Sequence, residues 1–523
     1  MAVGRGNKRW DVFYNGVMEQ RSLERRTIQL LQQIASYMAD RHAEAYLVGG
    51  AVRDLLLHEP VPQDWDIVSE GDAHALARQL AEKLGGYYVR MHEKASRVVV
   101  KRDGQETVFD VAPRVGKTLE EDLRLRDFTL NAIAAPLASV VQHVTEGAQL
   151  RLVDPLQGAS DLERRRLRVV DERAFQRDPL RLLRGVRCMQ RYSLAPDGKT
   201  AGLMQRNAPL LAGVASERVH DEMYAVLQPT GATEWLHVLD EYGLLTVLMP
   251  ECSPAKGVQQ PGLHHWDVFN HMLQTVAALE QVTTLLQGRA NEWKPRAETE
   301  TVTQATHRDL AEIRALLNEA EQQGIFSYTQ LAMPVLKLAA LLHDIGKTVT
   351  QTCDQEGIIH FYNHPQAGVP LAQAILKRLG ASTQDQRLVR QVVANHMRPG
   401  QLSRAVVTER AVRRFFVDLG PKGIDVALVS LADHVAMRGP EPLTDAWQRH
   451  LATVRFLLTR YIRERERILP PRLLQPQELM QHVNIPPGPL VGQLLEAIAE
   501  AQVEGRVQSK DEARWFVEER MRQ

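Results

Sequence analysis

Cysteine is scarce in this sequence of 523 residues. The three cysteines, Cys188, Cys252 and Cys353, lie far apart, and no Cys-x-x-Cys pair occurs among them. Their spacing excludes a disulfide scaffold and a thiolate metal site, and it favours a reducing compartment. We therefore expect the three thiols to be buried and inert.

Long apolar runs and an excess of either charge are also missing. No stretch approaches the roughly 18 uninterrupted apolar residues that span a bilayer, and the first ten residues contain no signal-peptide core. We therefore expect a cytoplasmic protein without membrane contacts. Lys+Arg and Asp+Glu both number 64, so any affinity for nucleic acid must come from a local basic patch.

What is present is the composition of a globular protein, with 44% apolar and 24% charged residues. The length predicts three or four domains. The periodicity of the apolar residues and the positions of Pro and Gly predict an α+β protein with five segments. These are a helical extension at 1–40, a mixed α/β head at 41–150, an all-α Arg-rich neck at 151–255, an all-α His-rich region at 256–465 with a polar insertion near 287–308, and a helical tail at 466–523.

The mixed region contains a strand followed by a glycine pair. The apolar run at 45–48 is followed by Gly49 and Gly50, then by Arg53 and Asp54 at the start of a predicted helix. Paired glycines at a strand-to-helix turn let backbone N–H groups approach a phosphate, although such a pair is more often simply a turn. A second pair of strands, at 98–100 and 107–111, is predicted to form a hairpin through Asp103-Gly104.

Three aspartates in these strands predict a divalent-metal site. Asp64 and Asp66 are two apart on one strand and so share a face, where their carboxylates repel each other unless a cation lies between them. Two solvated aspartates at a strand edge is the alternative. Asp110 is a charge within an apolar strand, which is tolerated mainly when it is paired or bound to metal. Three carboxylates suit Mg²⁺.

The neck contains a stripe of arginines. Residues 161–191 include ten Arg and no Lys. Five of these recur at spacings of four and three and are predicted to share one helical face: Arg177, Arg181, Arg184, Arg187 and Arg191. A solvated face is one interpretation. Recognition of bases or phosphates by planar guanidinium groups is the other, which the absence of Lys favours.

Four motifs in order resemble those of bacterial tRNA nucleotidyltransferases, the CCA-adding enzymes, and their poly(A) polymerase relatives. The motifs are Gly-Gly-x-Val-Arg-Asp at 49–54, Asp-x-Asp at 64–66, Arg-Asp-Phe-Thr-Leu-Asn-Ala at 126–132 and Asp-Pro-Leu-Arg-x-Leu-Arg at 178–184. The resemblance implies transfer of nucleotides from CTP or ATP to a tRNA 3′ end, with release of pyrophosphate.

The resemblance also implies roles for single residues. Asp64, Asp66 and Asp110 would be catalytic and would hold two Mg²⁺ ions. The triphosphate would bind at Gly49, Gly50, Arg53 and Asp54, and the ribose at Arg126 and Asp127. Asp178 and Arg181 would read the base, and the remaining nucleotide-binding residues would be Asn131, Arg184 and Arg187.

Three features depart from the family pattern. Leu125 stands where the family usually has Arg, and Arg177 stands where it usually has Glu. Only 15 residues separate Asp110 from Arg126, so the intervening loop is shorter than in full CCA-adding enzymes. The short loop resembles that of enzymes that add only the two C residues.

A second set of polar residues lies in the His-rich region. The doublet His343-Asp344 follows an apolar run and indicates a polar site that faces inward. The set resembles the ligands of the HD phosphohydrolase superfamily, which implies a transition metal such as Mn, Ni, Fe or Zn and hydrolysis of a phosphate ester. Its members are His271, His343, Asp344, His364, His396 and Asp433. A degenerate, purely structural HD domain is the alternative.

Other functions fit parts of the sequence. A poly(A) polymerase would use the same head residues. An HD hydrolase with a nucleotide-binding regulatory head belongs to a different class, and the three intact head aspartates argue against it. A non-catalytic RNA-binding protein would leave both polar sites unexplained. The sequence leaves the oligomeric state open.

Overall fold

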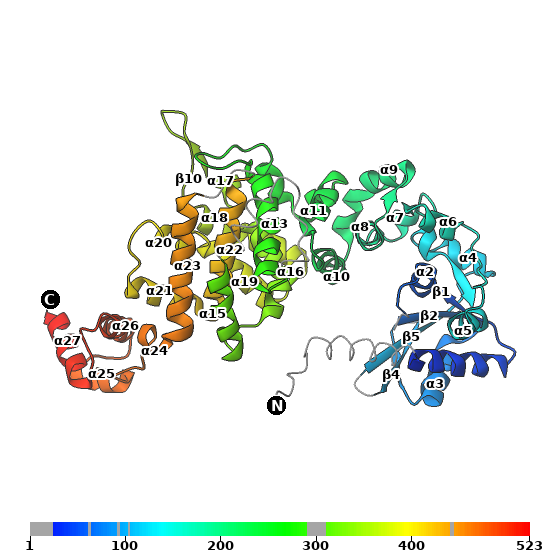
Figure 1. The fold of residues 1–523 in the computed structure, drawn as a ribbon, viewed down its shortest axis with the longest axis horizontal. Coiled ribbons are helices and arrows are strands. Elements are labelled where there is room, and N and C mark those ends of the chain that lie inside the picture. The colour runs from blue at the N-terminus through cyan, green and yellow to red at the C-terminus, as the bar shows by residue number, and fades with distance from the viewer. Residues whose placement is uncertain are drawn as a thin grey trace, which may run out of the picture. The chain divides into compact units, whose positions relative to one another are not determined.

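The computed structural model describes residues 25–60, 64–91, 95–102, 105–289, 310–439 and 444–522. The chain divides into two compact units, Met1–Gly213 and Val214–Gln523 (Figure 1). Each unit is described here by itself. The mixed head and the helical remainder confirm the predicted α+β class.

The first unit is built on a six-stranded mixed sheet in the order β3-β4-β5-β2-β1-β6. The parallel pair is β2 with β5, and the other neighbours are antiparallel. The strands are β1 (Ala45–Val48), β2 (Asp64–Ser69), β3 (Tyr87–Arg90), β4 (Ser96–Arg102), β5 (Gln105–Pro113) and β6 (Ala134–Pro136). The antiparallel pairing of β4 with β5 confirms the predicted hairpin, whose turn at 103–104 lies outside the described residues.

The two faces of the sheet differ in chemistry. Trp65 and Ile67 of β2 and Phe109 of β5 are buried in a core with the helix at 25–39 and with α3 (Ala73–Leu84). Because side chains alternate along a strand, Asp66 and Asp110 face the other way. The fold therefore places the predicted carboxylates together on the face opposite this core.

Helices complete the first unit. Of these, α8 carries the arginines, and α2 follows the glycine pair directly. The helices are α2 (Gly50–Leu56), α4 (Leu119–Arg124), α5 (Leu137–Glu146), α6 (Gly158–Glu163), α7 (Ala174–Arg177), α8 (Arg181–Tyr192) and α9 (Gly198–Asn207). A short parallel pair, β7 (Arg166–Leu167) and β8 (Ala195–Pro196), lies among them.

The second unit is helical. It begins with α10 (Ser216–Leu227), α11 (Ala232–Glu241) and α12 (Leu244–Leu248). A bundle follows, with α13 (Val268–Leu286), α15 (Ala311–Gln322), α16 (Pro334–Leu342), α17 (Lys347–Thr350), α18 (His364–Arg378), α19 (Thr383–Asn395), α20 (Met397–Leu402), α21 (Glu409–Leu419), α22 (Gly423–Met437), α23 (Asp445–Arg463) and α24 (Arg465–Ile468). Every residue of α16 is buried, as expected of a helix at a bundle centre.

Two smaller features extend from this bundle. The hairpin of β9 (Gln351–Cys353) and β10 (Ile359–Phe361) projects from it (Figure 1). The tail helices α25 (Pro476–Val483), α26 (Pro489–Val503) and α27 (Lys510–Arg522) enclose an apolar cluster of their own.

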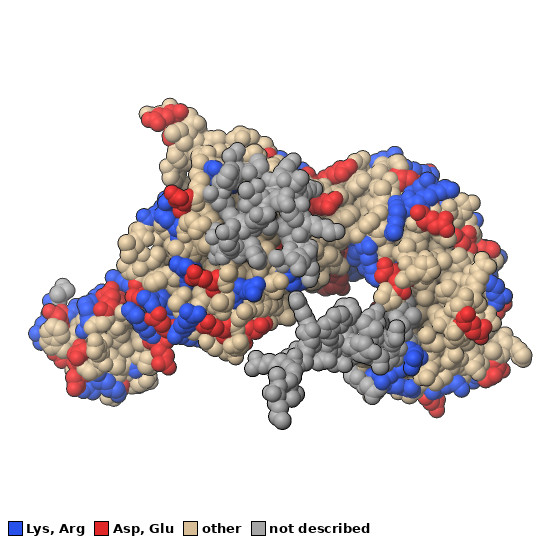
Figure 2. Space-filling view, viewed as in Figure 1, with Lys and Arg blue, Asp and Glu red and all other residues tan. Residues whose placement is uncertain are grey.

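Several expectations can now be compared with the structure. Cys188 and Cys252 are buried, but Cys353 is exposed, so the expectation of three buried thiols was wrong. The reason is that Cys353 lies on the projecting β9 strand, which covers no core. No helix within the described ranges is both long and apolar enough to cross a membrane. Figure 2 shows acidic and basic side chains interspersed, in keeping with the balanced charge.

The predicted insertion near 287–308 falls mostly outside the described residues, as do the first 24 residues of the predicted extension. The boundaries of the five predicted segments stay predictions.

Candidate active site and candidate metal centre

The three head carboxylates lie on adjacent strands. Asp64 and Asp66 are exposed on β2, with the buried Trp65 between them, which puts both on the open face of the sheet. Asp110 of β5 is the direct cross-strand partner of Asp66. Desolvation by the surrounding protein groups raises the pKa of Asp66 although part of its side chain is exposed, the nearby Arg126 opposes that rise, and the charge of Asp110 adds to it. A bound cation would relieve this repulsion.

Asp110 has a cationic partner within the protein. Arg97 of β4 donates from Nε and Nη2 to the two carboxylate oxygens, at 2.8 and 2.9 Å. Arg97 and Asp110 are paired residues of the hairpin, so strand register alone brings them together. The pKa of Arg97 is raised, first by its hydrogen bonds to Asp110. Sequence reasoning missed Arg97, although the register of the predicted hairpin could have identified it.

The glycine turn is closely surrounded. Gly49 has a φ of 70°, and a Cβ there would lie 3.3 Å from Nη1 of Arg126 and 3.8 Å from Oδ2 of Asp66. A side chain at this position would therefore be strained and would occupy the space between the turn and the carboxylates. The required glycine conformation supports the interpretation that the turn is a binding element.

Arg53 and Asp54 are buried and bonded to each other. Arg53 Nε donates to Asp54 Oδ1 at 2.9 Å, and Arg53 Nη1 donates to Asn131 Oδ1 at 2.5 Å. Tyr192 OH also donates to Asp54 Oδ1, at 3.1 Å. An anionic carboxylate does not attract a triphosphate, so the geometry gives Asp54 a different task from Arg53: it orients the guanidinium group.

The arginine stripe is shorter than predicted. Arg181, Arg184, Arg187 and Arg191 belong to α8, but Arg177 ends the separate helix α7. Arg177 pairs with Asp171 at 2.6 Å. The prediction of five arginines on one helical face was therefore wrong for Arg177. Pro179 explains the break, because the residue before a proline avoids the helical conformation and Asp178 is extended there, with a φ of −150°.

Asp178 and Arg181 consequently do not share a helix. Arg181 is the first residue of α8 and donates to the carbonyl oxygens of Arg126 and Leu125, at 2.8 and 2.9 Å. Burial lowers its pKa. Asp178 Oδ1 accepts from the Leu180 N–H at 3.2 Å. The two side chains therefore do not project from one helical face.

A cavity of about 440 Å³ joins these features, which is room for a small ligand. Its polar lining is dominated by guanidinium groups, with few carboxylates, as suits a polyanion. The lining consists of Gly49, Gly50, Arg53, Asp66, Val115, Asp122, Leu125, Arg126, Asp127, Asn131, Arg181, Arg184, Arg187, Cys188, Arg191 and Tyr192. Most of the predicted nucleotide-binding residues therefore meet around one cavity, and Asp54 and Asp178 are not part of its lining.

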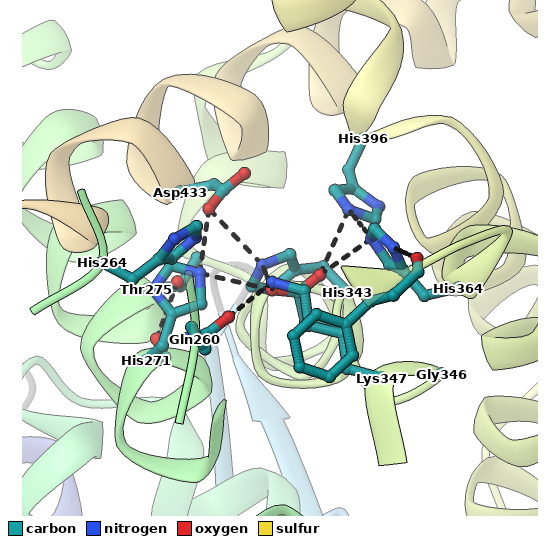
Figure 3. Close-up of polar contacts among 12 residues, drawn as sticks. Gln260, His264, His271, Thr275, His343, Gly346, Lys347, His364, His396 and Asp433 are labelled. Atoms are coloured by element: carbon teal, nitrogen blue, oxygen red, sulfur yellow. Dashed lines mark hydrogen bonds and ion pairs between the residues drawn. The ribbon is translucent and has the colours of Figure 1, made fainter. Parts of the chain in front are cut away.

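The second polar cluster gathers His271, His343, His364, His396 and Asp433 (Figure 3). The carboxylate of Asp344 lies among them. Oδ2 of Asp344 lies 3.4 Å from Nε2 of His271 and 3.2 Å from Nε2 of His343. Its other oxygen, Oδ1, lies 3.2 Å from Nε2 of His364 and 3.4 Å from Nε2 of His396. One carboxylate therefore joins two groups of potential metal ligands, each with atoms within 4.8 Å of one another.

Asp433 completes the first of these groups. Its Oδ1 lies 3.0 Å from Nε2 of His271 and 3.6 Å from Nε2 of His343. The six residues come from α13, the end of α16, the start of α18, the end of α19, and α22. The structure thus brings together all six residues that the sequence singled out. Imidazole and carboxylate donors suit a transition metal.

Hydrogen bonds at the second ring nitrogen fix the orientations of three of the imidazole rings. Nδ1 of His343, His364 and His396 each bonds a backbone carbonyl three residues earlier, at 2.7, 2.9 and 2.9 Å. These bonds leave Nε2 of each ring facing Asp344, as metal-binding histidines require. Burial lowers the pKa of His396. Burial also opposes protonation of His343, but Asp344 and Asp433 outweigh it and raise the pKa to about 10.

Sequence reasoning missed three residues at this cluster. Lys347 Nζ lies 2.5 Å from Oδ2 of Asp344 and donates to Gln260 Oε1 at 2.7 Å. His264 contacts His271 edge-on, with ring centroids 5.4 Å apart (Figure 3). Lys347 follows His343 by four residues and could have been included with it. Gln260 and His264 lie in an irregular segment that offers no periodic signal.

Three family models match the chain. Residues 45–168 match one described as the Poly A polymerase head domain, 194–256 match the probable RNA and SrmB-binding site of polymerase A, and 306–438 match the HD domain. An A-adding tRNA nucleotidyltransferase from Deinococcus radiodurans is 33% identical over 481 residues, which cover 91% of this chain and 95% of that protein. This chain belongs to the tRNA nucleotidyltransferase family. The resemblance found in the sequence is confirmed.

Other members of the tRNA nucleotidyltransferase family are nearly as similar. A CC-adding enzyme from Thermus thermophilus is 32% identical, over 91% of this chain and 93% of its own. A multifunctional CCA protein from Pseudomonas aeruginosa is 30% identical, over 68% of this chain and 74% of its own.

Solved structures share the fold. The apo form I of a CCA-adding enzyme aligns with a TM-score of 0.57 at 18% identity, covering 94% of this chain and 93% of that one. The Thermotoga maritima CCA-adding enzyme in complex with tRNA aligns with a TM-score of 0.54 at 19% identity, covering 94% and 95%.

Proposed function

We propose that this protein adds C, A or both to tRNA 3′ ends, using CTP or ATP and releasing pyrophosphate. The observation that carries the proposal is the single cavity that joins the Asp66 side of the sheet to the arginines of α8. The family supports the same reaction. The RNA 3′-hydroxyl would attack the α-phosphate, with the pyrophosphate leaving on the opposite side.

The positively charged residues around the cavity have different proposed roles. Arg53, together with the backbone N–H groups that follow Gly49, faces the space where a triphosphate would bind. Arg126 is anchored to Asp122 at 3.2 Å and lies beside the glycine turn, close enough to reach the ribose or the α-phosphate. Fixed guanidinium groups of this kind stabilise the charge that develops during phosphoryl transfer.

Nucleotidyltransferase and HD domains depend on metal ions, and the residues present fit that requirement. Asp64, Asp66 and Asp110 would hold Mg²⁺ ions, which supply activation of the attacking hydroxyl and neutralisation of the leaving pyrophosphate. Desolvation and the neighbouring carboxylates Asp110 and Asp64 raise the pKa of Asp66, and a bound cation would act against both effects. Asp110 already has Arg97, so it would share its oxygens between the guanidinium group and an ion.

The test is an extension assay. The protein is incubated with Mg²⁺, one labelled nucleotide at a time, and tRNA transcripts that end at the discriminator base, at C or at CC. A sequencing gel resolves the products. We expect extension by single residues on at least one of these ends. Long homopolymeric tails would instead indicate a poly(A) polymerase.

We also propose a second activity, the hydrolysis of a phosphate ester at the His271 to Asp433 cluster. Its support is the bridging position of Asp344 between two groups of histidines. His271, His343, Asp344 and Asp433 would hold one transition-metal ion, and His364 and His396 would hold a second that shares Asp344. Mn, Ni, Fe or Zn would suit this donor set and would supply an activated water for the hydrolysis.

A further inference from the structure

A chain of buried polar side chains joins the two ends of α8 through the head. It begins with Tyr192, the last residue of α8, and passes through Asp54 and Arg53 of α2. Arg53 then contacts Asn131. Asn131 Nδ2 donates to Asp127 Oδ1 at 3.0 Å, and Arg184 of α8 pairs with the other oxygen of Asp127 at 3.0 Å.

Five of the six residues in this chain of contacts have little access to water. Asp127, Tyr192, Arg53, Asn131 and Asp54 are 4, 5, 7, 7 and 8% exposed. Buried charge-assisted hydrogen bonds of this kind are stronger than exposed ones and hold their partners in one geometry. The guanidinium group of Arg53 also lies over the Tyr192 ring, 4.2 Å from its centroid. Arg53 is therefore held on two sides by Tyr192, directly and through Asp54.

Two arginines of this chain of contacts, Arg53 and Arg184, line the cavity. Arg53 lies beside the glycine turn, whereas Arg184 projects from the helix whose first residue is Arg181. A displacement of α8 must move Arg184, Tyr192 or both, and the rigid bonds transmit that displacement to Arg53. Tyr192 is a suitable anchor because burial raises the pKa of its hydroxyl, which therefore stays a donor.

We propose that Tyr192 is a positioning residue that couples the fit of the incoming base on α8 to the placement of Arg53 at the triphosphate. A base that fits leaves α8 in register and Arg53 in place. A base that does not fit shifts α8 and moves Arg53 away from the triphosphate. The wrong nucleotide is therefore discriminated against by a slower transfer step and not by weaker binding. This inference rests on the proposed nucleotide addition.

The test compares Tyr192→Phe with Tyr37→Phe. Tyr192→Phe keeps the ring over Arg53 and removes only the hydroxyl. Tyr37 is a matched control, because its hydroxyl donates to Gln79 Oε1 at 2.6 Å and its ring is buried in the core of the same unit, on the sheet face opposite the carboxylates. Single-turnover extension of a tRNA transcript gives the rate and the apparent Kd for the nucleotide that wild type prefers and for UTP.

We expect Tyr192→Phe to slow the preferred nucleotide about fivefold to tenfold and UTP much less, since one charge-assisted hydrogen bond is lost. The apparent Kd values should change less than twofold. Tyr37→Phe should leave both rates unchanged at a similar loss of thermal stability. Asp54→Asn keeps the side-chain shape and weakens the same link, so it must reproduce the pattern if Tyr192→Phe does not fold.

A double-mutant cycle tests the chain itself. In this series of polar contacts, no hydrogen bond joins Tyr192 directly to Asn131. Coupling between Tyr192→Phe and Asn131→Ala would therefore have to pass through Asp54 and Arg53. We expect the two losses of rate to be clearly less than multiplicative. Multiplicative losses, or an unchanged ratio of rates in Tyr192→Phe, would overturn the inference. Failure of wild type to extend any tRNA end would instead overturn the proposed function.

Discussion

At the scale of single residues, Asp66 is the head carboxylate that is subject to the most structural constraints. It belongs to the open face of the sheet, it pairs in register with Asp110, and it lines the cavity. The Arg97 pair reduces the charge of Asp110 but provides no equivalent partner for Asp66. We therefore attribute the need for an ion chiefly to Asp64 and Asp66.

Removing one of these carboxylates should stop the chemistry and spare tRNA binding. We expect Asp64→Ala or Asp66→Ala to lower the rate of nucleotide addition by at least about three orders of magnitude, because stabilisation of the transferring phosphoryl group is lost. RNA affinity, which comes from basic groups, should change little. Rates from the extension assay and Kd values from filter binding measure the two effects.

Glu106→Gln provides the matched control, because Glu106 is an exposed carboxylate of β5 that pairs with Lys101 on the surface. Near-normal incorporation by Asp64→Ala or Asp66→Ala would refute the assignment of these residues.

Arg181 and Asp178 determine a second prediction at this scale. We expect Arg181→Ala and Asp178→Ala to relax selectivity among CTP, ATP and UTP more than they slow the best nucleotide. One lost contact to a base edge costs about 1 to 3 kcal/mol, or roughly one to two decades of discrimination. Arg181 lines the cavity and Asp178 does not, so the larger effect should come from Arg181.

The measurement is the ratio of kcat/KM values for the three nucleotides on each tRNA end. Arg177→Ala is the control, because Arg177 ends the separate helix α7 and pairs with Asp171. Identical ratios in wild type and both variants would remove the base-reading role from Arg181 and Asp178.

At the scale of elements, the connection from β5 to α4 is short and anchored. It spans residues 114–118, where the Val115 N–H donates to Asp122 at 2.9 Å and the Lys117 N–H donates to Glu121 at 2.6 Å. Gly116 has a φ of 91°, and a Cβ there would lie 2.6 Å from Glu121. Val115 lines the cavity, so this tight turn forms part of its wall.

An anchored wall should limit which nucleotides the cavity accepts. Without a long loop that can reset the pocket between nucleotides, we expect C addition to be efficient and addition of the terminal A to be slower by at least tenfold or absent. The measurement is the rate with CTP on a transcript that ends at the discriminator base, compared with the rate with ATP on a transcript that ends at CC. Comparable rates would refute the argument from the short connection.

The helices and strands also show which features of the structure could be predicted from the sequence. The hairpin, the open face of β2 and the HD-type ligands were predicted because period-two alternation and adjacent polar pairs are local signals. The break at Asp178-Pro179 was overlooked because periodicity was followed across a proline. Arg97 was overlooked because the register of the hairpin was not worked out, although it pairs Arg97 with Asp110. The contacts of Tyr192 join segments up to 138 residues apart, as for Tyr192 and Asp54, and no local pattern encodes such contacts.

At the scale of the whole molecule, the chain carries two polar centres in separate compact units. The carboxylate site belongs to Met1–Gly213 and the histidine cluster to Val214–Gln523. Their donor sets differ, since one is made of carboxylates alone and the other mixes imidazole with carboxylate. The two proposed activities should therefore be separable by mutation.

We expect His343→Ala or Asp344→Ala to abolish any Mn- or Ni-dependent phosphatase or cyclic phosphodiesterase activity and to leave nucleotide addition within about twofold of wild type. His360→Ala is the control, because His360 is on the β10 strand and bonds Asp354 on the same hairpin. Hydrolysis of a chromogenic phosphodiester across a series of divalent metals provides the measurement. Absence of hydrolysis by wild type with every metal would make the cluster structural.

The central claim is that the head transfers a nucleotidyl group to tRNA, and differently labelled CTP tests it most directly. The protein is incubated with Mg²⁺, a tRNA transcript that ends at the discriminator base, and CTP labelled at either the α- or the γ-phosphate. The account predicts that the α-label enters the RNA and the γ-label appears in pyrophosphate, and that Asp66→Ala shows neither. An RNA that stays unlabelled in wild type, with either label released as inorganic phosphate, would contradict it.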